Sequence, residues 1–476
     1  MTTTTTTPPR TTKRWAALGL IGTAQLMVAL DATIVNVALP SAQHALGFTD
    51  ANRQWVITAY TLAFAGLVLL GGRIADLAGR KRAFLAGLAG FAAASAIAGA
   101  ANGLGMLVAA RAAQGAFAAL LAPTTLSLLA VTFPDLRERA RAFAVFGAIA
   151  GSGAAVGLVL GGALAEYLDW RWCLYVNVPI AVATAAGGWL VLPDARPAAR
   201  PRLDVPGAVL ATGGLVALVF ACTEAVGHGW ASSRVVTLLA AAAALLALFV
   251  ARQARADQPL LPLRIVRDRN RAGAYTAMAL ALAGMLGLLL FLTYYLQVVL
   301  HYSPIKAGLA FLPLSAAVQI GAGGIAARLA TRVRPRTLIV PGLLTAATAL
   351  LLLTRLEPGS GYAGIVLPAE ILLGIGMGCV FVPAIGIATS GVDHRDAGIA
   401  SAVATTAQQT GGTVGTALLN TIATSATAGS LATGATGAGA LVHGYTVAAA
   451  WAAAILAVAA VLAAALITAP TIDRRH

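Results

Sequence analysis

The sequence predicts an all-α integral membrane protein with 14 transmembrane helices, arranged as two six-helix bundles with two helices inserted between them. The composition excludes a soluble domain, because 59% of the 476 residues are hydrophobic and only 10% are charged, whereas soluble proteins average about 25% charged residues. Apolar runs of bilayer length recur along the chain, and a helix needs about 20 residues to cross the hydrocarbon core. Cations gather in alternate connections between these runs.

The apolar runs follow a polar tail at residues 1–14, which begins MTTTTTTPPR and is expected to be disordered. The first run is too long for the core of a signal peptide, so no cleavage is expected. The predicted spans are residues 15–39, 54–72, 83–101, 104–132, 142–164, 173–192, 205–223, 235–251, 272–298, 305–327, 337–354, 362–390, 398–424 and 445–468.

The net charge of +15 indicates membrane topology, and no nucleic-acid partner is expected. If the N-terminus is cytoplasmic, 26 of the 32 Lys and Arg residues fall in cytoplasmic segments, and five fall on the opposite side. The remaining cation, Arg111, lies within a span. This asymmetry follows the positive-inside rule and predicts an even number of spans with both termini cytoplasmic. We expect a multi-pass protein of the plasma membrane that is embedded in the lipid bilayer.

An internal repeat divides the chain into two halves. The segment GGRIADLAGRKR (Gly71–Arg82) follows the second span, and GGIAARLATRVR (Gly323–Arg334) follows the tenth. Repeated halves are typical of transporters in which one bundle moves against the other around a central site. The predicted units are an N-terminal six-helix bundle at 15–192, a linker region with two extra transmembrane helices at 193–271, a C-terminal six-helix bundle at 272–468, and a cytoplasmic tail at 469–476.

Two opposite charges lie at matched depth in the predicted spans. Asp31 lies eight residues, or ~12 Å, from the outer end of its span, and Arg111 lies seven residues, or ~10.5 Å, from the outer end of its own. A charge at the bilayer centre costs at least ~2.5–3.5 kcal/mol, so the two are expected to share one polar cavity. Burial disfavours the charged form of an Asp and a nearby Arg favours it, so a conformational change could load and release a proton here. A fixed ion pair that orients the two helices is the alternative.

Glu370 is the second intramembrane acid and lies eight residues into its span. This span is the repeat partner of 104–132, so Glu370 matches Arg111 in depth. Three roles remain open for it: a second proton site, a counter-charge for cationic substrates, and a hydrogen-bonded or protonated structural group.

The connection after the second span is short, and its glycines permit a close approach of the backbone. Asp76 can cap a helix or pair with Arg80, and the other cations can face lipid phosphates or carboxylates. A plain basic loop that sets topology is the alternative. The proposed cytoplasmic gate residues are Gly72, Arg73, Asp76, Gly79, Arg80 and Lys81.

Glycines in the fifth span predict close helix packing. Gly153, Gly157 and Gly161 recur every four residues, which places them on one helix face, and Gly162 follows directly. A nucleotide-binding loop is excluded because no strand precedes these glycines, and no Walker sequence occurs in the chain.

These features together resemble the major facilitator superfamily, specifically its 14-span drug:proton antiporters, over nearly the whole chain. Leu77 stands where the family's loop motif has a basic residue, and Leu158 stands where its antiporter motif has a proline that kinks the helix. The segments that carry the resemblance are LDATIVNVALP (Leu30–Pro40), the loop Gly72–Arg82, the group Arg111, Gln114 and Gly115, and the pair Gly157–Gly162 with WRWCLYVNVP (Trp170–Pro179).

The resemblance implies efflux of amphipathic organic compounds, often antibiotics, driven by inward proton flow. Asp31, Arg111 and Glu370 are the candidate proton-coupling residues. The proton-motive force supplies the energy, so no cofactor is expected. No metal is expected either, because the three Cys and six His residues do not cluster. We expect the protein to be a monomer. The tyrosines among the cavity candidates could equally be interfacial anchors or packing residues. The candidate residues of the substrate cavity are Asn36, Gln114, Tyr294, Tyr295, Gln297, Gln408 and Gln409.

A proton-coupled transporter of one metabolite, such as an amino acid, a sugar or a siderophore, is the alternative function. Only the antiporter-type fifth span favours the drug pump over it. A channel, a sensor or a membrane enzyme would need a filter motif, a signalling domain or paired catalytic groups, and the sequence shows none of these.

Overall fold

Long apolar helices make up most of the chain that the computed structural model describes, which is residues 11–133, 135–192, 204–256, 259–329, 332–389 and 397–469. These ranges contain no strand. Eleven helices within them are long and apolar enough to cross a membrane, and two shorter apolar stretches are Trp55–Val68 and Val156–Tyr167. Over their described residues, the 14 predicted spans coincide for most of their length with these helices, so the predicted all-α class is confirmed.

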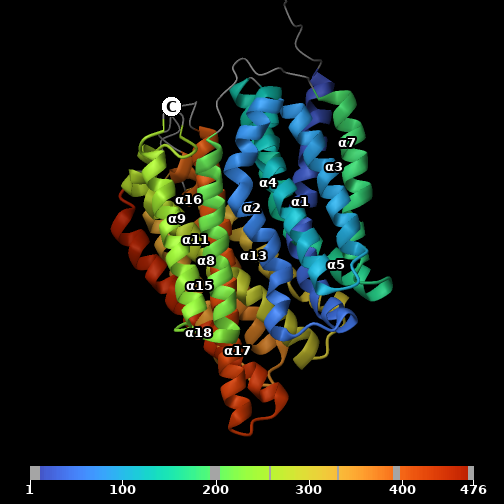
Figure 1. Cartoon of the computed structure of the whole chain (residues 1–476), viewed down its shortest axis with the longest axis vertical. Coiled ribbons are helices and arrows are strands. Elements are labelled where there is room, and N and C mark those ends of the chain that lie inside the picture. Colours follow the sequence, from blue (N-terminus) through green and yellow to red (C-terminus); the bar gives the residue numbers. More distant parts are fainter. Residues whose placement is uncertain are drawn as a thin grey trace, which may run out of the picture.

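The first seven helices pack together, from blue to green in Figure 1. The helix α1 packs against α5, and α4 packs against both α2 and α3. The predicted span 173–192 is divided into two helices by Val176. The bounds are α1 Thr11–Leu46, α2 Asp50–Ala78, α3 Arg80–Gly99, α4 Leu104–Thr132, α5 Leu136–Tyr167, α6 Trp172–Tyr175 and α7 Asn177–Val191.

Two further helices, α8 (Val205–His228) and α9 (Ser233–Gln253), pack against each other, and α8 also packs against α2 and α17. Asp204 caps the start of α8: its Oδ1 accepts from Gly207 N at 3.0 Å and from Arg252 Nε at 2.6 Å, and its Oδ2 accepts from Gln253 Nε2 at 2.8 Å. Burial alone raises the pKa of Asp204, but these hydrogen bonds and the charge of Arg252 bring it below its ordinary value. The short helix α10 (Leu263–Arg267) follows α9.

The remaining helices, from yellow-green to red in Figure 1, are less regular, because three π-helical segments (η1–η3) interrupt them. The helix α11 packs against α17, and α15 packs against α16 and α18. The bounds are α11 Arg269–Tyr294, η1 Tyr295–Val299, α12 Pro304–Ala310, α13 Leu312–Gln319, η2 Ile320–Ala326, α14 Ala327–Leu329, α15 Arg336–Leu353, η3 Tyr362–Val366, α16 Leu367–Thr389, α17 Ala397–Ala432 and α18 Gly437–Leu466.

The N-terminal group of helices (α1–α7) and the C-terminal group (α11–α18) meet near the lower end of Figure 1, the end at which α17 turns into α18. Gln297 Nε2 donates to the Val37 carbonyl oxygen at 3.1 Å, and Ile305 N donates to Glu166 Oε2 at 2.9 Å. The backbone of α12 lies against α5 so closely that a Cβ on Gly162 would come 2.5 Å from the Pro304 carbonyl oxygen. We call these contacts between the N-terminal helices and α11–α12 the lower interface.

The other predicted packing glycines of α5 face α1. A Cβ on Gly153 would lie 2.6 Å from Ala29 Cβ, one on Gly157 would lie 2.8 Å from the Leu30 carbonyl oxygen, and one on Gly161 would lie 2.8 Å from Ile34 Cγ1. The three glycines therefore let α1 and α5 touch along their length, whereas Gly162 faces α12.

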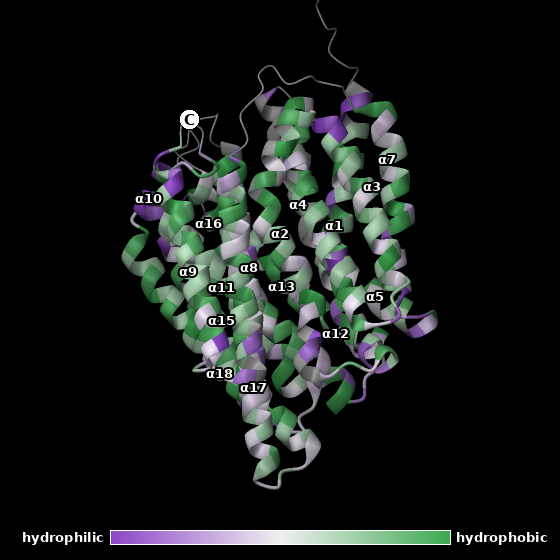
Figure 2. Cartoon of the chain, viewed as in Figure 1, coloured by the Kyte–Doolittle hydropathy of each residue, from purple (hydrophilic) through white to green (hydrophobic). Residues whose placement is uncertain are grey.

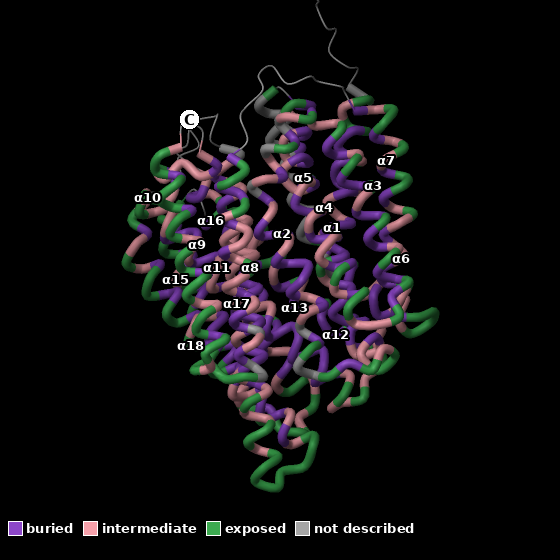
Figure 3. Tube along the Cα trace, in the orientation of Figure 1, coloured by how far each residue is buried: buried purple, intermediate pink, exposed green. Residues whose placement is uncertain are grey.

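Large apolar side chains are exposed on the helices. Most of the helical ribbon is coloured hydrophobic in Figure 2, and exposed positions recur along the helices in Figure 3. Leu190 is 82% exposed, Trp189 68% and Val461 67%. Side chains of this kind on a long apolar helix are suited to contact with lipid tails. The chain is therefore a multi-pass membrane protein.

Candidate functional site

Asp31 and Arg111 lie together at the centre of a buried hydrogen-bond network among the N-terminal helices. Arg111 Nη1 donates to Asp31 Oδ2 at 2.6 Å and to Gln114 Oε1 at 3.0 Å. Gln114 Nε2 donates in turn to Asp31 Oδ1 at 3.0 Å. All three residues are at most 1% exposed, so bulk water does not screen their interactions.

The helix α2 fixes the guanidinium group of Arg111. Arg111 Nε donates to the Val56 carbonyl oxygen at 3.1 Å, and Arg111 Cζ lies 4.4 Å from the centroid of the Tyr60 ring. Gly115 permits this approach, because a Cβ there would lie 2.9 Å from the Tyr60 carbonyl carbon. Hydrogen bonding and the cation–π contact thus hold the cation from two sides.

The sequence analysis missed two polar members of the network. Asn177 Nδ2 donates to Asp31 Oδ1 at 2.7 Å, and Ser95 Oγ accepts from Gln114 Nε2 at 2.7 Å. Asn177 is the first residue of α7, and both residues are fully buried. Asn177 could have been found as the one amide in the apolar span 173–192, whereas a single Ser in a helix such as α3 carries little signal.

The hydrogen bonds define the charge state of Asp31 in this conformation. Its carboxyl group accepts from the nitrogen atoms of Arg111, Gln114 and Asn177. Nitrogen atoms of guanidinium and amide groups donate and do not accept, so none of these three partners could accept a proton from the carboxyl group. The network therefore holds Asp31 as a carboxylate paired with Arg111.

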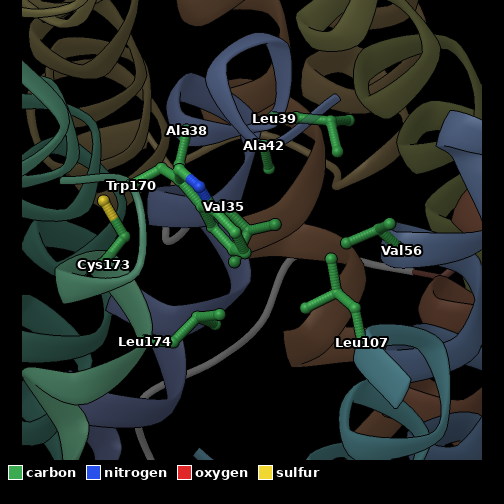
Figure 4. Close-up of a pocket in the computed structure, with 9 residues that line it drawn as sticks. All are labelled: Val35, Ala38, Leu39, Ala42, Val56, Leu107, Trp170, Cys173 and Leu174. Atoms are coloured by element: carbon green, nitrogen blue, oxygen red, sulfur yellow. The ribbon is translucent and has the colours of Figure 1, made fainter. Parts of the chain in front are cut away.

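A small apolar cavity lies beside this network (Figure 4), since Val56, whose carbonyl oxygen accepts from Arg111 Nε, is one of its lining residues. Val35 follows Asp31 by one helical turn, and Leu107 precedes Arg111 by one turn. Apolar walls offer no hydrogen bonds to a hydrated proton, so they separate the ion pair from the lower end. The lining residues are Val35, Ala38, Leu39, Ala42, Val56, Leu107, Trp170, Cys173 and Leu174.

Glu370 lies in the C-terminal group of helices, fully buried in the first turn of α16. The Tyr362 hydroxyl oxygen is 3.1 Å from Glu370 Oε2, and the other carboxyl oxygen, Oε1, has no hydrogen-bond partner among the described residues. No ion pair to Glu370 occurs in the described part of the chain either. Its surroundings thus differ sharply from those of Asp31.

The residues predicted to line a substrate cavity are distributed over several places. Gln114 belongs to the charge network, while Tyr294 and Gln297 lie in the lower interface, where Tyr294 Oη donates to Gln43 Oε1 at 2.5 Å. Tyr295 Oη donates within its own bundle, to the Ser360 carbonyl oxygen at 2.8 Å. The remaining candidates are Asn36 on α1, with Nδ2 3.4 Å from the Ala32 carbonyl oxygen, Gln408 on α17, with Nε2 3.4 Å from Met278 Sδ, and the part-buried Gln409 beside it.

A row of buried polar groups without partners lies on α17 and was not predicted. Asn420 is fully buried, and neither its amide nitrogen nor its amide oxygen has a hydrogen-bond partner among the described residues. The buried hydroxyl groups of Thr406 and Thr410 also have none. Helical spacing places the three on one side of α17, away from the glycines that face α11. Unpartnered polar groups in an apolar interior are costly, so they mark a place where a ligand could bind.

The proposed gate residues lie at the upper end of Figure 1, where α2 turns into α3. Gly79 makes this turn with φ of 91°, a conformation that favours glycine. Lys81 Nζ donates to the Trp189 carbonyl oxygen at 2.7 Å, and Arg80 is part-buried. A Cβ on Gly72 would lie 3.5 Å from Pro123 Cβ. The side chains of Arg73 and Asp76 lie outside the described residues.

Two packed groups of membrane-spanning helices, one of which encloses a buried ion pair, have the architecture of a secondary transporter. The chain belongs to the Major Facilitator Superfamily, whose family model matches residues 21–416.

Several relatives carry names that refer to antibiotics. The chain is 52% identical to the puromycin resistance protein pur8 of Streptomyces alboniger, over 92% of this chain and 88% of that protein. It is 41% identical to the cephamycin export protein CmcT of Amycolatopsis lactamdurans, over 88% and 87%. It is 35% identical to the tetracenomycin C resistance and export protein of Streptomyces glaucescens, over 86% and 76%.

Solved structures of transporters share the fold. A peptide transporter POT in complex with sulfate superposes with a TM-score of 0.69 at 14% identity, covering 94% of each chain. A bacterial homolog of the human lysosomal transporter Spinster superposes with a TM-score of 0.66 at 15% identity, covering 95% of this chain and 96% of that one. At these identities the likeness concerns the fold alone.

Proposed function

We propose that this protein exports amphipathic organic compounds, antibiotics among them, in exchange for protons that flow inward. The family and the antibiotic-related names of its relatives support export of this substrate class. The buried pair of Asp31 and Arg111 is the observation that carries proton coupling, because it is an ionisable site in the interior of a transporter fold.

Proton exchange at this site follows from the surroundings of the Asp31 carboxylate. In the described conformation Arg111 and two amide groups stabilise the charged form, and apolar residues close the path from below. If the lower interface opens and Arg111 moves away, the buried carboxylate loses its counter-charge and takes up a proton. Return to the described arrangement expels that proton toward the upper end.

The orientation in the membrane follows from the positive-inside rule. The upper end of Figure 1 carries the basic turn after α2, the start of α1 and the end of α18, and it is the cytoplasmic side, while the lower interface faces outward. The protein resides in the plasma membrane and needs no cofactor. One proton crossing 100 mV supplies about 2.3 kcal/mol, which sustains roughly a 40-fold gradient of an uncharged substrate.

The substrate binds between the two groups of helices as a monomeric transporter cycles. Asn36 and Gln408, with the unpartnered row of Thr406, Thr410 and Asn420 on α17, offer hydrogen bonds in apolar surroundings. A few polar groups within an apolar cavity suit amphipathic molecules of varied shape.

Transport by the purified protein in liposomes with an imposed pH gradient tests this proposal. Puromycin, a cephamycin and amphipathic dyes should be taken up against a gradient into liposomes in which the cytoplasmic side of the protein faces outward. The Asp31→Asn variant should insert into the membrane and lose the gradient-driven uptake. Wild-type transport by that variant contradicts proton coupling at Asp31, and transport of a single metabolite with no dye or antibiotic contradicts drug export.

A further inference from the structure

The hydroxyl group of Tyr362 lies between two acceptors but carries a single proton. It is 2.6 Å from the Ala310 carbonyl oxygen and 3.1 Å from Glu370 Oε2. The shorter contact identifies the Ala310 carbonyl as the acceptor of the tyrosine proton. The proton in the hydrogen bond between Tyr362 and Glu370 must then come from the carboxyl group of Glu370.

The burial of Glu370 leads to the same assignment. Its Oε1 has no partner among the described residues, and the residue is fully buried. A carboxylate in such a place would be an uncompensated charge, whereas a protonated carboxyl needs only one acceptor for its O–H. In this conformation Glu370 is therefore a neutral acid that donates to Tyr362.

Ala310 connects this pair to the lower interface. It is the last residue of α12, and the carbonyl groups at a helix end need partners from outside the helix. The same helix presses on α5, where Pro304 and Ile305 lie against Gly162 and the carbonyl oxygen of Leu158 lies against Gly308. Tyr362 thus fastens the end of the helix that closes the outward side.

We propose that Glu370 is a second proton site and that its proton locks the lower interface through Tyr362 and Ala310. Loss of the proton leaves a carboxylate, which draws the Tyr362 hydroxyl proton toward itself because charge-assisted hydrogen bonds are stronger. The Ala310 carbonyl then loses its donor, and α12 is released from its closed position. This inference rests on the proposed function and agrees with it in direction. A proton that reaches Glu370 from outside would favour the closed lower interface, as inward proton flow requires.

The other ionisable groups near Glu370 are few. Tyr362 is on η3, and Tyr302, before α12, is close enough to Tyr362 to act on it electrostatically. Lys306 on α12 lies with Nζ 3.8 Å from the centroid of the Tyr302 ring. The elements packed against α16 in the described chain bring no carboxylate or cation into contact with Glu370 itself. The hydrogen bonding of Tyr362 therefore changes with the protonation of Glu370.

Spin labels on the outward side can measure the lock directly. Leu168→Cys and Gly359→Cys place labels on exposed loops after α5 and after α15, and the three native cysteines are buried. Distances between the labels, measured by pulsed electron paramagnetic resonance in nanodiscs from about pH 5 to 9, report opening of the lower interface. Asp31→Asn with Arg111→Met serves as the background, because it removes the other titrating pair.

In this background we expect a short distance at low pH and a growing long-distance population as the pH rises. Glu370→Gln, whose amide still donates to Tyr362, should keep the short distance at every pH. Tyr362→Phe should lose the pH response, because no hydroxyl is left to fasten Ala310. Tyr275→Phe is the matched control, since its hydroxyl lies 3.5 Å from a carbonyl at the opposite end of α16, and it should titrate like the background.

A Glu370→Gln or Tyr362→Phe protein that titrates like the background overturns the lock. The liposome assay separates this failure from that of the proposed function. If the wild type exports its substrates with protons while the label distances ignore Glu370, only the lock is wrong. If the distances follow Glu370 but a pH gradient drives no export, the lock stands and the proposed antiport is wrong.

Discussion

The two intramembrane acids, one in each half of the molecule, have opposite surroundings. Asp31 accepts hydrogen bonds from three donors, one of them the guanidinium of Arg111 at 2.6 Å. Glu370 has one hydroxyl partner, at 3.1 Å, and a carboxyl oxygen with none among the described residues. Both are fully buried, so burial alone cannot explain the difference. The number and charge of the partners make Asp31 a carboxylate and Glu370 a neutral acid.

The backbone around the two acids differs in the same way. Asp31 and Arg111 lie within the uninterrupted helices α1 and α4, whereas Glu370 lies in the first turn of α16, which follows directly on η3. The three π-helical segments of the described chain all lie after residue 294. π-Helical turns are rare and concentrate at functional sites. The N-terminal helices thus hold a charge in a fixed network, while the C-terminal helices contain π-helical segments whose hydrogen bonds can rearrange.

The largest effect is expected at Asp31. Asp31→Asn leaves Arg111 buried without a counter-charge, which costs about 3–5 kcal/mol of stability and abolishes gradient-driven transport. Adding Arg111→Met should recover most of the stability but none of the transport, because the double variant is neutral and cannot exchange a proton. Thermal unfolding midpoints and liposome transport measure the two effects. Recovery of transport in the double variant would show that the pair only orients the helices.

Gly162→Ala should act on the lower interface rather than on either acid. A Cβ at Gly162 would come 2.5 Å from the Pro304 carbonyl oxygen, and overpacking of this kind costs about 1–3 kcal/mol. The cost falls only on the closed form, so the label distance on the outward side should lengthen and transport should slow. Gly105→Ala is the control, since nothing lies within 4 Å of a Cβ there. An unchanged distance in Gly162→Ala would mean that α5 and α12 separate without this contact.

Asp204 is a third buried acid that lies outside the membrane-spanning segments. Asp204→Asn should cost about 1 kcal/mol near neutral pH, because the part-exposed Arg252 is screened by solvent. The folded protein lowers the pKa of Asp204 below its ordinary value, so the carboxylate stabilises above about pH 4 and the contribution is lost as the pH falls through the folded pKa. The unfolding midpoints of variant and wild type should therefore converge in acid and differ by a constant amount above it. A difference that grows toward acid would mean that folding raises the pKa of Asp204.

The smallest effect is expected at Glu370, from the same chemical change as at Asp31. Glu370→Gln replaces a neutral acid by a neutral amide that can still donate to Tyr362, so the unfolding free energy should change by less than about 0.5 kcal/mol. The thermal unfolding midpoint, measured beside that of Asp31→Asn, provides the comparison. A loss as large as that of Asp31→Asn would show that Glu370 is charged in the folded protein.

The sequence was sufficient for the helical class and for the principal pair of the site. Apolar length identifies spans because each must cross the bilayer, and matched depth placed Asp31 beside Arg111 because an isolated charge in lipid is too costly. The proton roles of these residues and the domain boundaries stay predictions.

Features that depend on helix register could not be predicted. The contact between Tyr362 and Glu370 depends on the π-helical turn Tyr362–Val366, for which the sequence shows no pattern. Asn177 reaches Asp31 only because the span 173–192 breaks at Val176 and begins a new helix there. Tyr294 and Gln297 were expected in a cavity, but contacts between the two groups of helices engage both, and those contacts follow from tertiary packing.

Infrared spectroscopy distinguishes the charge states of Asp31 and Glu370, because a protonated carboxyl group absorbs at a different frequency from a carboxylate. The wild type, Asp31→Asn and Glu370→Gln would be compared at neutral pH, with isotope exchange to identify buried groups. We predict that the band of a buried protonated carboxyl is present in the wild type and in Asp31→Asn and is missing in Glu370→Gln. Loss of that band in Asp31→Asn, with its persistence in Glu370→Gln, would contradict the assignment of charges to the two halves.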